Sequence, residues 1–494
     1  MSASLSGLAA RISEIRDSPR HSALVRITHW INTASFLGLL VSGFAILLAH
    51  PRFYWGETGS LATPSVLNLP LPYMKGGPSG WGRNLHFLAA WVCVLNGLLY
   101  VVSGVLTRHF RRNLLPAKAD LTWDSMRRVV WNHLRLIRPD AETSRAYNPL
   151  QRLTYLAVVF ALLPFMMWTG FAMSPTIVSV FPGVVTLLGG QETARTLHFF
   201  AADLLVLFLV VHLAMVWLAG FRARAGAMIV SPRGASAEPT GVLLTRRGLV
   251  TTGLGTAAGA TGLAVAATLA DRYGLIPPDH GGIYGVGKTL TYAAQRLLTP
   301  DHAMAREFSR SDISKVFPVN GFPPVDETFE RLRAGGFADW RLVIDGLVSR
   351  PARFSLDELR RFPASTQITH QACEEGWSFI AEWTGVALSY LLNLVGVRPQ
   401  ARYVFFLSFG PKQKWGSLDM PDAWHPQTLI AYGMNGEPLP APNGAPLRVR
   451  VPRQLGFKSI KYLTRITVTD TPKGFGKGWG SSSPEHGYAW YGGI

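Results

Sequence analysis

One stretch decides how the second half of the chain is organised: Ile368-Thr-His-Gln-Ala-Cys373-Glu-Glu-Gly-Trp377. The chain has two cysteines, and Cys93 lies within an apolar run, so Cys373 is the one cysteine outside a predicted membrane span. A lone thiol is either a small buried hydrophobe or a ligand or nucleophile, and soft thiolates suit redox-active metals. Two cysteines so far apart in sequence indicate no disulfide framework.

Two later stretches accompany this cysteine: Asn443-Gly-Ala-Pro-Leu-Arg-Val-Arg-Val-Pro452 and Gly456-Phe-Lys-Ser-Ile-Lys461. Together the three stretches resemble the sulfite oxidase-type molybdopterin fold, and among its members the catalytic subunits of periplasmic methionine sulfoxide reductases. The resemblance runs from about Phe308 to the C-terminus. It implies that Cys373 ligates molybdenum.

The same resemblance implies further site residues, each by its matching position. Those expected to bind the pterin are Asn320, Ser408, Asn443, Arg448, Lys458, Ser459, Ile460 and Lys461. For any single lysine or arginine the alternative is a solvated strand edge, but the joint pattern favours a phosphate cradle. Glu374 and Glu375 are candidate proton donors next to the cysteine, and His425 is either a cofactor or substrate contact or a structural residue.

Composition and charge predict a membrane part in the first half of the chain. The 494 residues are 48% hydrophobic, and the mean hydropathy is positive, which is too apolar for an ordinary soluble enzyme. The net charge is +18, but the segment after Tyr273 carries a surplus of only +5. Because most of the excess basic residues sit beside apolar runs, the expected partner is a lipid bilayer and not a nucleic acid.

Five runs are long and apolar enough to cross a bilayer. They are Leu24–Leu48, Leu85–Leu106, Leu153–Ser174, Leu197–Gly220 and the Gly/Ala-rich Leu249–Ala270. The segments on one side of these spans carry 19 Lys/Arg and those on the other side 5. By the positive-inside rule, the N-terminus, the 108–152 loop and the 222–247 linker are cytoplasmic. We therefore expect an inner-membrane protein with its catalytic half in the periplasm.

The segment Thr245-Arg-Arg-Gly-Leu-Val250 before the fifth run resembles a twin-arginine export signal. A paired arginine is also a common topology signal, so the motif leaves both interpretations open. An export route for folded, cofactor-loaded domains would suit a molybdopterin domain. No convincing small-residue cleavage site precedes Asp271, so we expect the segment to remain as a fifth span.

Four histidines predict two haem sites in the membrane part. His198 and His212 share the fourth span, and fourteen residues place them about 40° apart around the helix and about 21 Å apart along it. The predicted topology puts His29 at the cytoplasmic depth of His212, and His86 at the periplasmic depth of His198. We therefore expect two bis-histidine haem b sites, because zinc fits two histidines without nearby carboxylates or thiolates poorly.

Two glycines agree with this arrangement, since Gly43 and Gly104 face the seams of their histidines at the depth of the other haem. Close helix packing would explain them nearly as well. The histidine pattern resembles the di-haem cytochrome b561 type over about Arg20 to Phe221, which includes the membrane subunits of formate dehydrogenases and nickel-iron hydrogenases. That resemblance implies electron exchange with quinone near the cytoplasmic haem. Asp203 within the fourth span is either a proton relay or a helix-helix hydrogen-bond partner.

The soluble half is predicted to be a mixed α+β domain after a linker with one short helix. Alternating residues predict strands at 403–407, 447–451 and 462–468, and Ser355-Leu-Asp-Glu358 is a capping box that opens a helix. The predicted fold class is thus an all-α four-helix di-haem membrane bundle plus a fifth span, followed by a soluble α+β sulfite oxidase-type molybdopterin domain.

The expected boundaries are those of six segments. They are a cytoplasmic N-terminus 1–23, a di-haem domain 24–221, a linker 222–248, the fifth span 249–270, a periplasmic linker 271–307 and the molybdopterin domain 308–494.

The predicted function is electron transfer between the quinone pool and a periplasmic molybdenum site through two b haems. We favour a reductase that takes oxygen from a small oxide such as a sulfoxide or N-oxide. Sulfite oxidases place arginines just after the ligand cysteine, whereas Glu374 and Glu375 follow it here, and 414–418 lacks their tyrosine. The alternatives are a sulfite or other oxidase or dehydrogenase that donates electrons to quinone, and a haem anchor whose molybdenum-like domain is catalytically idle and binds a partner.

Overall fold

A computed structural model describes residues 23–74, 79–116, 121–134, 149–218, 220–229, 268–410 and 414–493. Internal contacts divide the chain into two compact units. The first unit comprises residues 1–37, 90–165 and 201–273, and the second comprises 38–89, 166–200 and 274–494. The second unit thus combines the helical residues within 38–89 and 166–200 with the whole sheet domain.

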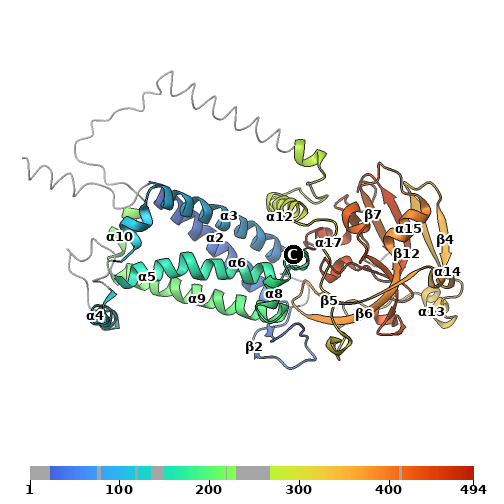
Figure 1. Ribbon diagram of the computed structural model, residues 1–494, viewed down its shortest axis with the longest axis horizontal. Helices are drawn as coiled ribbons and strands as arrows, with labels where there is room; N and C mark the ends of the chain where they lie inside the picture. The colour runs from blue at the N-terminus through green and yellow to red at the C-terminus, as the bar shows by residue number, and fades with distance from the viewer. Residues whose placement is uncertain are drawn as a thin grey trace, which may run out of the picture. The chain divides into compact units, whose positions relative to one another are not determined.

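Four stretches of helix are long and apolar enough to cross a membrane, as the sequence predicts for its first four spans. They are α2 (Ala23–Leu47), α3 (Ser79–Leu106), the series α5 (Pro149–Ala157), η4 (Val158–Leu162) and α6 (Leu163–Ala172), and α9 (Gln191–Leu218). Figure 1 draws them in blue to green. At most 17% of each most apolar window is buried, so these helices present apolar surface suited to lipid.

The first unit also contains three shorter helical segments: η1 (Phe110–Leu114), α4 (Trp123–Leu134) and α10 (Phe221–Ile229). Within this unit an amide joins α3 to α2, because Asn96 Nδ2 donates to the backbone oxygen of Thr28 at 2.8 Å and to Asn32 Oδ1 at 2.7 Å. Buried polar groups need such partners. The fifth predicted span, 249–270, and its twin-arginine motif lie almost wholly outside the described residues.

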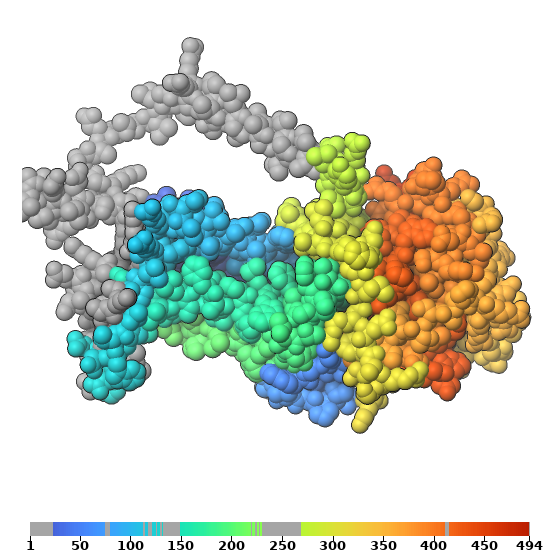
Figure 2. All heavy atoms as spheres, in the orientation of Figure 1, coloured from blue at the N-terminus to red at the C-terminus, as the bar shows by residue number. Residues whose placement is uncertain are grey.

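In the second unit, the segment between α2 and α3 contains two short paired strands, β1 (Arg52–Phe53) and β2 (Leu67–Asn68). The segment between α6 and α9 contains α7 (Pro175–Val180) and α8 (Gly183–Thr186). After the described chain resumes, α12 (Gly285–Leu298) is the short helix predicted for the linker. Figure 2 shows this yellow region lying against the orange and red residues of the sheet domain.

The sheet domain has the predicted α+β composition, with two five-stranded sheets. One has the order β10-β9-β6-β5, with β11 also pairing β9, and the other has the order β4-β3-β12-β7-β8. All pairs are antiparallel except β12 with β3. The strands are β3 (Arg341–Gly346), β4 (Ala352–Ser355), β5 (Ala364–Ala372), β6 (Ser378–Ala387), β7 (Tyr403–Ser408), β8 (Gly416–Asp419), β9 (Leu429–Met434), β10 (Glu437–Pro438), β11 (Arg448–Arg450) and β12 (Leu463–Thr469).

The three strands predicted from alternation are β7, β11 and β12, with ends shifted by at most one residue. Short helices cover the sheets: η5 (Arg310–Asp312), α13 (Glu327–Ala334), α14 (Leu356–Arg361), α15 (Leu388–Val395), α16 (Met420–Ala423), η6 (Ala441–Asn443), η7 (Gly456–Lys458) and α17 (Ser482–Glu485). The predicted capping box opens α14, with Glu358 N donating to Ser355 Oγ at 3.1 Å and Ser355 N donating to Glu358 Oε2 at 2.7 Å.

The end of the chain packs against α7. The carbonyl of Gly493 accepts hydrogen bonds from Ser174 Oγ at 2.6 Å and from Thr176 N at 3.2 Å. Trp490 and Tyr491 are buried with Tyr292 of α12 in a cluster of aromatic rings. The tail therefore joins the sheet domain to a segment between two membrane helices, within the second unit.

Candidate functional site

In the second unit, the imidazole rings of His86 of α3 and His198 of α9 lie close together. Their ring centroids are 6.3 Å apart, with 57° between the ring planes. Two imidazoles that bind one iron from opposite sides, each nitrogen about 2 Å from the metal, would have centroids roughly 6 Å apart. The pair therefore fits a haem iron, and haem ligation by these residues stays a prediction.

A hydroxyl orients each of these two imidazoles. Ser42 Oγ lies 3.1 Å from His86 Nδ1, and Thr169 Oγ1 lies 2.9 Å from His198 Nδ1. Each hydroxyl also donates its single proton to a carbonyl of its own helix, three residues back. The hydroxyl oxygen must then accept from Nδ1–H, which leaves the Nε2 lone pair of each ring for a metal.

The other predicted pair lies in the first unit. The centroids of His29 and His212 are 6.4 Å apart, with 49° between the planes, so this pair fits an iron by the same measure. Aromatic rings surround it: Trp30 lies edge-on to His29 at 5.3 Å, and Phe208 stacks on His212 at 5.8 Å. His29 Nδ1 is buried without a hydrogen-bond partner among the described residues, so this site lacks the hydroxyl found in the second unit.

The glycines follow two different patterns. A Cβ at Gly43 would lie 3.9 Å from Cε1 of His86, and a Cβ at Gly170 would lie 3.7 Å from Cε1 of His198. Both glycines therefore line the histidine pair, as expected for a cofactor approach. A Cβ at Gly104 would lie 2.5 Å from the Phe110 ring, so close packing accounts for that glycine instead.

Cys373 lies in the tight turn between β5 and β6. Its backbone N donates to the carbonyl of Trp377 at 2.8 Å, and Gly376, at φ +91°, donates to the carbonyl of Cys373. Such a φ favours glycine. The sulfur lies 3.4 Å from Glu374 Oε2. Burial, followed by the carboxylates of Glu374 and Glu375, raises the pKa of the thiol. Ligation of a metal by this sulfur stays a prediction.

Two buried arginines lie on the same face of β11, where alternate residues point the same way, and both contact Trp383 of β6. The guanidinium carbons of Arg448 and Arg450 lie 4.8 and 5.2 Å from the centroid of the Trp383 ring. Burial lowers the pKa of Arg448 to about 10 and that of Arg450 to about 9. Neither forms an ion pair with a carboxylate of the described residues, and Nε of both and Nη1 of Arg450 have no partner there.

Buried cations without anions are costly, so this arrangement fits an anionic group such as a pterin phosphate. Arg450 lies in the stretch Asn443–Pro452 but is not among the pterin residues predicted from the sequence. Its spacing of two from Arg448 in a predicted strand was the signal that would have identified it.

Four other predicted pterin residues gather around Lys461. Lys461 Nζ donates to the carbonyls of Asn320 at 2.8 Å and Pro442 at 2.7 Å. Ser408 Oγ donates to the carbonyl of Lys461 at 2.8 Å, and Arg448 Nη1 donates to the carbonyl of Asn443 at 2.9 Å. The structure thus brings Asn320, Ser408, Asn443 and Arg448 together with Lys461. Their contact with a pterin stays a prediction.

The other three predicted pterin residues are held by the protein itself. Lys458 Nζ donates to the carbonyls of Ser417 at 2.6 Å and Trp490 at 2.8 Å, and burial lowers its pKa to about 7. Ile460 packs in the main hydrophobic core. Ser459 Oγ accepts from Val451 N at 3.4 Å. These contacts fix the segment that follows β11, and a pterin role for the three residues stays a prediction.

His425 is engaged on both ring nitrogens. Its Nε2 lies 3.1 Å from the carbonyl of Ala303, and its Nδ1 accepts from Gln427 N at 3.2 Å. Burial, followed by the charge of Arg453, lowers its pKa to about 4. His425 is therefore neutral at pH 7, and these bonds favour the structural alternative for this residue.

A buried cluster of charges, which the sequence analysis missed, lies nearby. The carboxylate of Asp422 contacts the guanidinium groups of Arg296 and Arg453, the latter at 2.6 Å. Arg296 also reaches Asp419 at 2.7 Å, and Tyr292 OH donates to Asp419 Oδ2 at 2.7 Å. Although burial alone would raise it, the two arginines lower the pKa of Asp422. The cluster joins α12 to α16 and contains none of the predicted cofactor residues.

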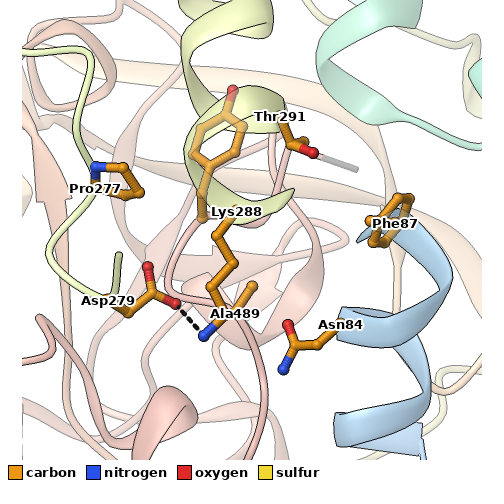
Figure 3. Close-up of a pocket in the computed structure, with 8 residues that line it drawn as sticks. Asn84, Phe87, Pro277, Asp279, Lys288, Thr291 and Ala489 are labelled. Carbon is orange, nitrogen blue, oxygen red and sulfur yellow. Dashed lines mark ion pairs between the residues drawn. The ribbon is translucent and has the colours of Figure 1, made fainter. Parts of the chain in front are cut away.

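A small cavity lies where the start of α3, α12 and the tail meet (Figure 3). Its wall includes Asn84 and Phe87 of α3 and the ion pair Lys288–Asp279, whose Nζ–Oδ2 distance is 2.8 Å. Ala489 of the tail completes it. The cavity wall includes none of the predicted metal ligands and is separate from the Cys373 turn.

The fold and these sites define a membrane cytochrome b joined to a molybdopterin oxidoreductase. Residues 20–229 match the prokaryotic cytochrome b561 family, and residues 331–475 match the oxidoreductase molybdopterin binding domain. A candidate protein-methionine-sulfoxide reductase subunit, YedZ1 of Azospira oryzae, is 36% identical over 200 residues, which are 40% of this chain and 71% of the relative. The chain belongs to the family of that subunit and carries a molybdopterin domain in addition.

A second relative matches the other half. The protein-methionine-sulfoxide reductase catalytic subunit MsrP of Ralstonia nicotianae is 35% identical over 145 residues, which are 26% of this chain and 44% of the relative. Among solved structures, the sulfane dehydrogenase SoxCD of Paracoccus pantotrophus is 27% identical, with a TM-score of 0.26, over 27% of this chain and 39% of that one. The chain therefore spans less than half of each of these two proteins. The comparisons confirm a molybdenum oxidoreductase with a cytochrome b membrane domain.

Proposed function

We propose that this molybdenum oxidoreductase passes electrons one at a time between the quinone pool and its molybdenum site through two b haems. One observation carries the proposal: the His86–His198 pair and the Cys373 turn belong to one compact unit. A carrier and an acceptor held in one unit need no diffusing partner between them. The chain thus joins in one polypeptide two parts whose relatives are named as a subunit and as a catalytic subunit.

For the haems we propose His29 with His212 and His86 with His198 as axial ligands. The two centroid distances and the free Nε2 lone pairs in the second unit support these roles. Ser42 and Thr169 hold the rings of the second pair and keep their protons on Nδ1. When bound, the haems supply one-electron carriers.

For molybdenum we propose Cys373 as the protein ligand. Arg448 and Arg450 would bind the pterin phosphate, with Asn320, Ser408, Asn443 and Lys461 around it, and the unpaired guanidinium atoms above Trp383 support this cradle. When bound, the group supplies oxygen-atom transfer. The protein's part is to hold the sulfur in a rigid turn and to exclude water from it, since the side chains of Cys373, Glu374 and Glu375 are all buried.

For the direction we propose abstraction of oxygen from a small oxide of the sulfoxide or N-oxide type. Glu374 Oε2 lies 3.4 Å from the sulfur of Cys373, and this carboxyl group, after taking up a proton, is placed to pass it to a departing oxygen. Carboxylates beside the sulfur would repel sulfite, at a cost of about 1 kcal/mol or more per close pair. The sulfoxide reductase in the name of the catalytic relative is consistent with this substrate class.

For localisation we propose an inner-membrane protein whose catalytic domain lies in the periplasm, with domains at 24–221 and 308–494. The asymmetry of 19 and 5 basic residues supports this orientation. Reporter fusions after Arg128 and after Ser349 test it. The first fusion should be active only as a cytoplasmic reporter and the second only as a periplasmic one, and the opposite result would reverse the orientation.

The experiment that tests the function starts with metal analysis of the purified enzyme, which should give about one molybdenum and two haems per chain. The haems are then reduced with a quinol analogue and mixed with methionine sulfoxide, dimethyl sulfoxide, trimethylamine N-oxide or sulfite. Reoxidation by an oxide supports the proposal. Reduction of oxidised haems by sulfite would reverse the direction, and haem without molybdenum would leave the idle-domain alternative.

A further inference from the structure

The same four-residue pattern occurs on the two helices whose histidines face each other in the second unit. The helix α3 reads Arg83-Asn-Leu-His86, and α9 reads Arg195-Thr-Leu-His198. In a helix, three residues return to within about 60° of the starting direction, and side chains lean towards the N-terminus. Each arginine therefore extends beyond its histidine towards the beginning of its helix.

Both arginines reach the turn that carries Cys373. Arg83 Nη1 donates to the carbonyl of Glu374 at 3.4 Å. The guanidinium of Arg195 lies against the backbone of Gly376, because a Cβ there would come within 3.0 to 3.2 Å of three of its atoms. The residue after Cys373 and the third residue after it are thus each held by an arginine that lies one turn before a proposed haem ligand.

Arg195 is itself rigidly placed. Its Nη1 and Nη2 donate to the carbonyls of Arg52 and His50, both at 2.6 Å, and its guanidinium carbon lies 4.7 Å from the centroid of the Phe53 ring. A guanidinium with fixed partners on two edges and one face presents its remaining face in one position. It can therefore act as a support for Gly376 and not merely as a mobile surface charge.

Other contacts already attach the sheet domain to the segments between the membrane helices. Gly59 and Ser378 exchange two backbone hydrogen bonds, at 2.8 and 3.3 Å. Arg306 pairs with Glu57 at 2.8 Å. Because these contacts attach the domain through Ser378 and Arg306, and not through Glu374 or Gly376, the two arginines are not needed for attachment alone.

We propose that Arg83 and Arg195 are positioning residues. They hold the Cys373 turn at a fixed position relative to the His86–His198 pair and so couple the two redox sites. The proposal rests on the proposed function. Each path from a histidine to the turn consists of one helical turn of bonded atoms, an arginine side chain and one contact. Electrons cross bonded atoms more readily than gaps, so loosening either contact slows their passage.

The overall reaction balances with quinol as the reductant. One sulfoxide takes up two electrons and two protons and gives one sulfide and one water. One quinol releases two electrons and two protons and becomes a quinone, and the electrons pass singly through the haems. The arginines neither donate nor accept electrons or protons in this scheme.

The test uses the holoenzyme and the variants Arg83→Gln, Arg195→Gln and the double variant. Oxide reduction is driven either by a quinol analogue, whose electrons pass through the haems, or by reduced viologen, which delivers electrons directly to the molybdenum site. Loss of the Arg83 hydrogen bond to Glu374, or of the Arg195 packing contact with Gly376, should lower the quinol-driven rate by about tenfold in each single variant, with less than about twofold change in the viologen-driven rate. Arg→Lys should restore part of the loss at Arg83 and less at Arg195, where a planar group is required.

A second measurement needs no turnover. Amide hydrogen exchange in the peptide 372–378 should accelerate in the arginine variants, while exchange in 52–68 stays as in wild type. The matched control is Arg306→Gln, which removes an attachment contact outside the turn and should leave both driven rates and the exchange of 372–378 unchanged.

The outcomes separate this proposal from the function it rests on. Equal losses in the quinol-driven and viologen-driven rates, an equal loss in Arg306→Gln, or no change at all would overturn the coupling role. If sulfite reduces the wild-type haems, the proposed direction fails. Electrons then cross the same contacts in reverse, and the arginine variants must slow haem reduction by sulfite for the coupling role to survive.

Discussion

Removing the hydroxyl of Thr169 should raise the midpoint potential of one haem. The substitution Thr169→Val keeps the shape of the side chain and deletes the oxygen that lies 2.9 Å from His198 Nδ1. A ligand imidazole that donates to such an oxygen gains electron density, which favours the oxidised metal. Without the oxygen, the reduced state of the haem that we propose for His86 and His198 should be favoured relative to the wild type.

The size of the shift follows from the burial of this contact. Thr169 is fully buried, so no water replaces the lost oxygen, and a neutral hydrogen bond is worth about 1 kcal/mol. If the oxidised iron strengthens the bond by a comparable amount, the one-electron potential rises by roughly 40 mV. Haem affinity should fall by about tenfold as well, as is common when the partner of a ligand histidine is removed.

The assay is a spectroelectrochemical titration of the two haems in detergent. The matched control is Thr33→Val in α2. Among the described residues its hydroxyl bonds to the carbonyl of His29, at 2.9 Å, and to no imidazole nitrogen. A potential that stays within a few millivolts of the Thr33→Val value, or that falls, would refute the assignment of the Nδ1 proton and of the ring as a ligand.

Three further predictions follow from the same structure. His86→Ala should remove one haem and abolish quinol-driven turnover while the other haem stays visible in the optical spectrum, and His29→Ala should remove the other haem; loss of the same haem in both variants would contradict the pairing. Cys373→Ser should leave a folded protein that loses turnover, because the alcohol stays protonated at neutral pH, and full activity would exclude the sulfur as ligand. Asp422→Asn should destabilise the sheet domain by about 3–5 kcal/mol, read as a lower unfolding temperature, because it leaves Arg453 buried without its anion. In the wild type, Asp422 contributes fully to the free energy of unfolding above its unfolded pKa of about 4. This contribution is lost as the pH falls towards the lower folded pKa of the carboxyl group. An unfolding temperature unchanged between pH 7 and pH 3 would contradict the prediction.

The sequence predicts the membrane helices well because lipid imposes one strong requirement on length and polarity. Helical geometry then fixes which side of α9 carries both His198 and His212, and the antiparallel run of the spans selects their partners. The ring pairs in the structure have the composition that this reasoning predicts. What it could not supply is the role of Ser42 and Thr169, although each directly precedes a glycine that lines the histidine pair.

The sheet domain was harder to predict beyond its strands. A local pattern identifies a strand but not the residue that contacts it from a distant segment. The hydrogen-bond partners of Lys458 and His425, which are Trp490 in the tail and Ala303 in the linker, could therefore not be predicted. The same holds for the charge cluster around Asp422, whose arginines come from α12 and from the segment after β11. Such networks depend on long-range packing, which a single sequence does not display.

The charges around Cys373 support the proposed preference for a neutral oxide over sulfite. Arg83 and Arg195, which reach the turn, donate hydrogen bonds to backbone carbonyls. Glu374 Oε2 lies 3.4 Å from the sulfur of Cys373. A dianion close to the Cys373 sulfur would meet the carboxylates of Glu374 and Glu375 at close range, which costs electrostatic energy. A sulfoxide carries no net charge and gains a proton as its oxygen leaves, and Glu374, after taking up a proton, would supply it beside the proposed metal ligand. In the proposed reaction, the residues that disfavour sulfite would therefore assist the reduction of an oxide.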